Sequence, residues 1–118
     1  MTFPVARPLA LLADIHGNLP ALEEVLPDAL RRARPELCFV LAGADPFEGD
    51  RLGRLALTKG GLAARDTLVR DTLDDAGVPI CLTLAGGYAE NIRDTVDINV
   101  NTLRVFTRVS RRVESEPT

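Results

Sequence analysis

The sequence has little of the residues that usually build metal and redox sites. It contains one histidine, His16, and two cysteines, Cys38 and Cys81, among its 118 residues. A single histidine excludes a site built on several histidines. Both cysteines sit inside apolar runs, without a spacing suited to metal binding or to a disulfide, which predicts two buried free thiols.

Long apolar stretches are also absent. No segment approaches the roughly 20 consecutive apolar residues of a membrane-spanning helix, so we expect no membrane partner. Two prolines interrupt residues 1–8, and only five apolar residues follow them, which argues against a secretory signal. We therefore expect a cytoplasmic protein.

Charge of one sign is not in excess either. A net charge of −3, with 26% charged and 46% hydrophobic residues, is typical of a globular protein and indicates no nucleic-acid partner. The one dense basic cluster is better explained as complementing a helix dipole than as a phosphate site; it comprises Arg104, Arg108, Arg111 and Arg112. The length allows one domain, which we place at residues 1–114, with a polar tail at 115–118.

Three short apolar runs predict β-strands at residues 9–13, 37–41 and 80–85. Unbroken apolar runs of this length are typical of strands buried on both faces of a parallel sheet. Apolar residues at helical spacing predict a helix after each strand. The order β-α-β-α-β-α indicates a small three-layer parallel α/β domain, in which all three strands end on the same rim.

The predicted helices have distinct signals. The first covers residues 19–34, with Asn18 as its N-cap and Pro27 predicted to bend it. The second follows two glycines and closes at Gly77, with its charged residues, Arg65 and Asp66 among them, expected on a solvated face. The third is predicted to place one apolar stripe inward, formed by Ile92, Val96, Val100 and Leu103.

Polar residues follow each predicted strand at the rim where ligands of open α/β sheets collect. Asp14 and His16 follow the first strand, and Asp45 and Asp50 follow the second. Asp14, His16 and Asp50 together offer two carboxylates and one imidazole, which suits a zinc-type ion with open positions. The alternatives are a histidine bonded within its own loop, an aspartate capping a helix, and a loop aspartate accepting backbone N–H bonds.

Tyr88 is the only tyrosine and follows Gly86 and Gly87, whose lack of side chains would let the backbone approach a ligand. Its hydroxyl could donate to a developing oxyanion. The alternative is a half-buried aromatic residue with its hydroxyl in water.

Several segments also follow the order of a known family. They are Ala42 to Thr58 with its Gly-Ala-Asp-Pro and Gly-Asp-Arg-Leu-Gly sequences, Gly61 to Asp66, Ala85-Gly86-Gly87-Tyr88, Asp94 to Val96 and Asn101-Thr102. From about residue 35 to 106 the chain thus resembles the C-terminal part of the histone deacetylase superfamily, particularly its bacterial and acetoin-utilisation-type branches.

The resemblance implies a partial arginase/deacetylase fold and a zinc-dependent amide hydrolase acting on an acetylated amine or acetyl-lysine. It implies one zinc ion held by Asp50, with Asp14 and His16 imitating the family's Asp-x-His ligands. Tyr88 would then polarise the acetyl carbonyl, and Gly86, Gly87 and Asp45 would lie on the substrate side. The family's tandem histidine pair is missing, so we expect a truncated member with weak or no activity.

Two alternatives stay open. Residues 9–26, with the sequence Asp14-Ile15-His16-Gly17-Asn18, look like the start of a calcineurin-like metallophosphoesterase, although such a two-metal site needs more histidines. A non-catalytic interaction module is the other, because three helices barely cover both faces of a three-stranded sheet. An uncovered face or edge would favour a homo-oligomer.

Overall fold

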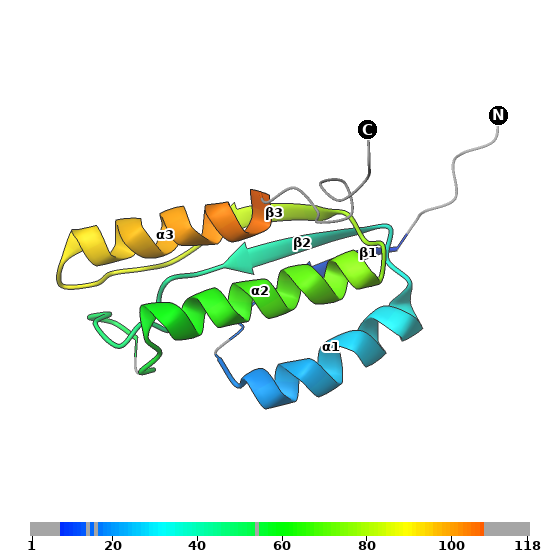
Figure 1. Cartoon of the computed structure of the whole chain (residues 1–118), viewed down its shortest axis with the longest axis horizontal. Helices are drawn as coiled ribbons and strands as arrows, with labels where there is room; N and C mark the ends of the chain where they lie inside the picture. The colour runs from blue at the N-terminus through cyan, green and yellow to red at the C-terminus, as the bar shows by residue number, and fades with distance from the viewer. Residues whose placement is uncertain (1–7, 14, 16, 54, 108–118) are drawn as a thin grey trace, which may run out of the picture.

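The strands and helices alternate along the chain as the sequence predicts (Figure 1). A computed structural model describes residues 8–13, 15, 17–53 and 55–107. Its elements are β1 (Leu9–Leu12), α1 (Leu19–Ala33), β2 (Leu37–Ala42), α2 (Lys59–Asp75), β3 (Ile80–Leu84) and α3 (Ile92–Thr107). The predicted α/β class and element order are confirmed.

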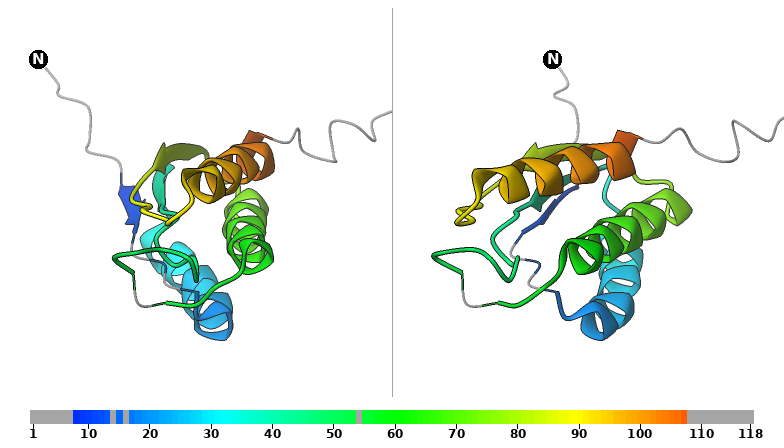
Figure 2. Two further views of the ribbon diagram at one scale, coloured as in Figure 1. Left: turned by 90° about the vertical axis from the view of Figure 1, so that its left-hand side faces the viewer. Right: turned by 60° about the vertical axis from the view of Figure 1, so that its left-hand side comes forward.

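The three strands form one parallel sheet in the order β1-β2-β3. Leu11 lies opposite Phe39 of β2, and Phe39 lies opposite Cys81 of β3. Both crossovers step in the same direction across the sheet, and right-handed crossovers of this kind place their helices on one face. Figure 2 shows all three helices on the same side of the sheet.

The main core lies between this helical side and the sheet. Leu26 and Leu30 of α1 and Val69 and Leu73 of α2 pack on Cys38 and Val40 of β2, and Phe106 of α3 closes the cluster. Strand residues of matching parity join them from the neighbouring strands, namely Ala10, Leu12, Ile80 and Leu82. These residues form the single buried face of the sheet, because side chains alternate between faces along a strand.

The opposite face of the sheet is open, which corrects two predictions. Leu9 and Leu11 of β1 are 64% and 71% exposed, so the strands are not buried on both faces. Cys38 is buried as predicted, but Cys81 is exposed because it points to the open face. Burial raises the pKa of the Cys38 thiol, which keeps it protonated and inert.

The first two helices start and stop where their capping residues indicate. The Asn18 side chain accepts a hydrogen bond from the backbone N–H of Ala21 at 3.1 Å, and α1 continues through Pro27 as one helix. The Thr58 hydroxyl caps α2 in the same way, accepting from the N–H of Gly61 at 3.0 Å. Gly77, at a φ of +70°, follows the end of α2, as the sequence predicts.

The burial of charged and apolar residues on α2 and α3 differs from the prediction. Arg65 and Asp66 are buried instead of solvated. On α3 the inward side consists of Ile98 and Thr102, while the predicted inward stripe is exposed; that stripe comprises Ile92, Val96, Val100 and Leu103. Helical spacing identified which residues share a face of α3, but not which face packs on the domain. None of the described helices is long and apolar enough to cross a membrane.

Candidate functional site

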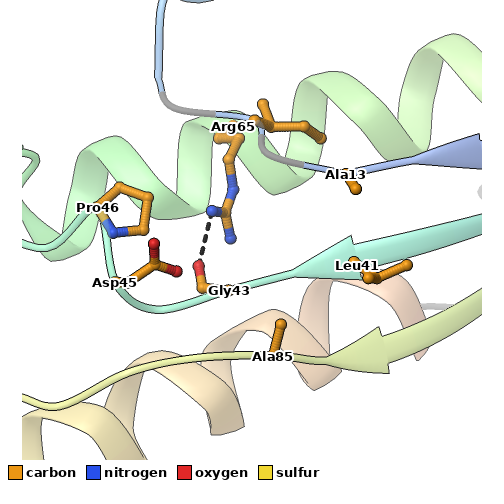
Figure 3. Close-up of a pocket in the computed structure, with 8 residues that line it drawn as sticks. Ala13, Leu41, Gly43, Asp45, Pro46, Arg65 and Ala85 are labelled. Carbon is orange, nitrogen blue, oxygen red and sulfur yellow. Dashed lines mark hydrogen bonds between the residues drawn. The ribbon is translucent and has the colours of Figure 1, made fainter. Parts of the chain in front are cut away.

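The segments that follow the three strands converge at one edge of the sheet, as parallel topology requires. They enclose a cavity of about 180 Å³ (Figure 3). Ala13 and Ile15 line it from the segment after β1, Asp45 and Pro46 from the loop after β2, and Ala85 from the segment after β3. Leu41, Gly43 and Arg65 complete the lining. The predicted convergence of three loops is therefore present in the structure.

Among the described residues that line this cavity, Asp45 is the one that carries a carboxylate. It is partly buried, and no residue in the described part of the chain donates a hydrogen bond to its side chain. Its carboxylate lies against Gly43 so closely that a side chain at Gly43 would collide with it. A side chain at Gly53 would in turn collide with the carbonyl oxygen of Asp45. Two glycines thus leave room for Asp45 to sit at the rim with its oxygens available.

Asp50 has a different environment. Its side chain is buried, with 8% of the residue exposed, and both carboxylate oxygens accept backbone hydrogen bonds. Oδ1 accepts from the N–H groups of Leu52 at 2.9 Å and Gly53 at 2.7 Å. Oδ2 accepts from the N–H of Tyr88 at 2.7 Å. The carboxylate therefore connects the loop after β2 to the loop after β3.

These hydrogen bonds also set the ionisation of Asp50. Burial alone would raise its pKa, but the three backbone N–H groups outweigh burial and hold the pKa below its ordinary value. The negative charge of Asp50 thus stabilises the two loops, as expected for a loop aspartate that accepts backbone N–H bonds. Asp50 is thus held by backbone donors, whereas the described residues place no hydrogen-bond donor on the Asp45 carboxylate. The metal-ligand role that the resemblance implies for Asp50 stays a prediction.

The loop that carries Tyr88 is held in place by its backbone. The carbonyl of Tyr88 accepts from the N–H of Arg51 at 2.8 Å, and the carbonyl of Gly86 accepts from the N–H of Ala44 at 2.7 Å. A Cβ atom at Gly87 would lie 2.9 Å from that of Ala44, so this close approach requires glycine. Tyr88 itself is 61% exposed, which leaves its ring free to contact a ligand.

The remaining two predicted ligands, Asp14 and His16, lie outside the described residues. Their chain neighbours Ala13 and Ile15 line the same cavity as Asp45. Within the described part of the chain, no group of three or more His, Cys, Asp or Glu residues could hold a metal ion. The described residues thus supply one metal donor to the cavity, and their donor set is incomplete for zinc.

Arg65 is a site residue that sequence reasoning missed, together with Asp66 and Thr102. Arg65 lines the cavity and donates from Nη1 to the carbonyl of Gly43 at 2.8 Å. The sequence did contain a signal for its burial. Arg65 and Asp66 lie three and four residues after Leu62, and Val69 follows at the same helical spacing. That spacing places both on the inward stripe of α2.

Comparison with known proteins gives one family over most of the chain. A family model of the histone deacetylase domain matches residues 3–103. The match includes residues 9–26, where the sequence looks like the start of a phosphoesterase. It therefore accounts for both resembling segments with a single family.

Three relatives illustrate the extent of the similarity. An uncharacterized protein of Picosynechococcus sp. is 46% identical over 83 residues, which cover 70% of this chain and 28% of that protein. Histone deacetylase 2 of Arabidopsis thaliana is 34% identical over 73 residues, covering 62% of this chain and 19% of the relative. A histone deacetylase-like amidohydrolase of Pseudomonas aeruginosa is 33% identical over 73 residues, covering 61% and 19%. The chain thus spans between 19% and 28% of the length of these relatives.

Proposed function

Because the chain belongs to the histone deacetylase family, we propose that it forms one part of the active-site rim of a zinc-dependent deacetylase and has weak or no turnover alone. The observation that carries this proposal is the Asp45 carboxylate. It lines a cavity where three strand ends meet, and no residue in the described part of the chain donates a hydrogen bond to it. The substrate class would be an acetylated amine or acetyl-lysine. The chain would then act as a truncated member of its family.

One zinc ion is the cofactor we propose for this rim. Asp45 would be one ligand, and Asp14 and His16 are the further donors that the sequence offers next to Ala13 and Ile15 of the cavity wall. When bound, zinc supplies a Lewis acid that polarises an amide carbonyl and lowers the pKa of bound water. One imidazole and two carboxylates form a donor set that suits zinc and leaves a position open.

Tyr88 is the residue we propose for the developing negative charge on the amide oxygen. Its exposed ring is carried by a loop held to the rim through Asp50 and Ala44. A phenol O–H that is positioned before reaction stabilises an oxyanion without reorganisation. Gly86 and Gly87 would let the substrate approach the backbone of this loop.

The weak activity follows from the absence of a second imidazole. His16 is the only histidine in the sequence, so if it binds zinc it cannot also take the proton of the attacking water. Loss of a general base typically lowers a rate by about 10²- to 10⁴-fold. The chain would need a base from elsewhere to reach the rates of an intact enzyme.

Zinc titration separates the two candidate carboxylates. We expect Asp45→Asn to weaken zinc binding at least about tenfold, because a neutral amide is a poor substitute for a carboxylate ligand. Asp75→Asn, which neutralises an exposed carboxylate at the far end of α2, is the matched control and should bind zinc as the parent chain does. Calorimetry measures both. Unchanged affinity in Asp45→Asn, or zinc loss confined to a folded Asp50→Asn variant, would contradict the assignment to Asp45.

An activity assay tests the proposal that the chain alone has weak or no deacetylase turnover. The purified chain with zinc should turn over an acetyl-lysine surrogate no faster than zinc in buffer. A zinc-dependent turnover of about 1 s⁻¹ or more, which is ordinary for enzymes, would contradict the proposal that this chain lacks its base.

A cytoplasmic location remains a prediction.

We also propose that the open sheet face mediates self-association. Leu9 and Leu11 are exposed on β1, which is an edge strand, and apolar edge strands tend to pair with another chain. Light scattering should show a dimer or larger species that Leu11→Asp converts to a monomer. A parent chain that is monomeric at all concentrations tested would refute this proposal.

A further inference from the structure

Arg65 and Asp66 form a buried ion pair next to the rim. Each side chain is 2% exposed, with Arg65 Nε donating to Asp66 Oδ1 at 3.0 Å. Arg65 Nη2 also lies 2.9 Å from that oxygen without forming a hydrogen bond to it. Burying two charges is costly, and such a pair is weak support for stability by itself. The role of the pair is therefore sought in the other groups that its two side chains hold in place.

Those contacts join three elements. Arg65 projects from α2 and donates from Nη1 to the carbonyl of Gly43, directly after β2 (Figure 3). Thr102 of α3 donates its hydroxyl to Asp66 Oδ2 at 2.6 Å. One side of the guanidinium is thus fixed by Asp66, which is itself fixed from α3. The other side holds a peptide group two residues before Asp45.

A second Arg-Asp pair on the same helix provides a comparison. Arg70 bonds the carboxylate of Asp71 and donates from Nη1 to the carbonyl of Val105 at 3.0 Å. The chemistry matches that of Arg65, with an adjacent aspartate and a backbone carbonyl of another element. Arg70, however, bonds a carbonyl of α3, and none of its hydrogen bonds within the described part of the chain reaches the rim.

We propose that Arg65 is a positioning residue that orients the Asp45 carboxylate toward the cavity by fixing the Gly43 peptide, with Asp66 and Thr102 holding its guanidinium. Two peptides separate Gly43 from Asp45, so the direction of the Gly43 carbonyl limits the direction in which Asp45 leaves β2. The backbone hydrogen bond from Ala44 N–H to the carbonyl of Gly86 holds the same turn from the segment after β3. The inference rests on the proposed zinc site of Asp45 and adds the residue that prepares it.

Arg65→Lys tests the inference while keeping the buried charge. A lysine ammonium is a point charge that cannot span Asp66 and the Gly43 carbonyl as the guanidinium fork does. We expect zinc affinity to fall about 10- to 100-fold, the usual effect of removing a residue that orients a metal ligand. Hydrogen exchange of the Ala44 N–H should become at least about tenfold faster, because losing a charge-assisted hydrogen bond is worth about this factor. Arg70→Lys makes the same chemical change away from the rim and should alter neither quantity.

A milder pair of variants keeps the test decisive if Arg65→Lys does not fold. Thr102→Val removes the hydroxyl donor to Asp66 and should, like Arg65→Lys, weaken zinc binding and speed up Ala44 exchange. Thr102→Ser keeps the hydroxyl and should leave both quantities as in the parent chain. A parent chain that binds no zinc would refute the proposed metal site, and the exchange of Ala44 would still test the positioning role. Normal Ala44 exchange in folded Arg65→Lys and Thr102→Val variants would overturn the inference.

Discussion

Replacing Asp50 by asparagine tests whether its carboxylate holds the rim together. The amide keeps one carbonyl oxygen for the two N–H donors of its own loop, but its NH₂ group then faces the N–H of Tyr88. One charge-assisted hydrogen bond is lost, worth about 1.5–3 kcal/mol, and the other two weaken to neutral strength. We expect Asp50→Asn to lower the free energy of unfolding by about 2–4 kcal/mol at neutral pH.

The pH dependence gives this prediction a sign that a simple packing defect would not reproduce. The pKa of Asp50 is lower in the folded chain than its ordinary value of about 3.9. Its contribution is therefore complete above the ordinary value and is lost as the pH falls through the lower folded pKa. The stability gap between the parent chain and Asp50→Asn should be constant above about pH 5 and shrink below about pH 4.

Urea unfolding measures the gap with two signals. Circular dichroism at far-ultraviolet wavelengths follows the helices, and the fluorescence of Tyr88 follows the rim, because the sequence has no tryptophan and no second tyrosine. Asp75→Asn serves as the control for removing a surface carboxylate. Equal stability of the parent chain and Asp50→Asn at neutral pH, or a gap that is the same in acid, would refute the reasoning.

Two further predictions concern the open sheet face and the close loop approach. Cys81 should react with a thiol reagent at least about 100-fold faster than Cys38, because the latter is buried with a raised pKa; equal rates by mass spectrometry would contradict the burial pattern. Gly87→Ala should destabilise the chain by about 1–3 kcal/mol through its contact with Ala44. Gly60→Ala, whose new Cβ meets nothing closer than 3.7 Å inside α2, should leave stability unchanged or raise it, and the same urea assay compares the two.

The sequence specified the elements more reliably than the surfaces they bury. Apolar runs located the strands because each run is too short for a typical helix and closely follows a proline, namely Pro8, Pro35 or Pro79. The same runs predicted burial on both faces, and Leu11 and Cys81 are exposed. An apolar run indicates that both faces of a strand favour burial. It does not report whether these three helices supply that cover, which depends on both crossovers placing α1 and α2 on one side.

The positions of strand ends do not distinguish Asp45 from Asp50. Both carboxylates follow β2, and parallel topology brings both to the ligand-binding rim. What separates them is the direction of backbone N–H groups, three of which donate to Asp50, two to Oδ1 and one to Oδ2. That direction is set by the turn at Gly53 and by the pairing with the Tyr88 loop, a contact between residues 38 positions apart. Strand ends therefore predicted which rim holds the two carboxylates, whereas the different environments of Asp45 and Asp50 depend on contacts between distant segments.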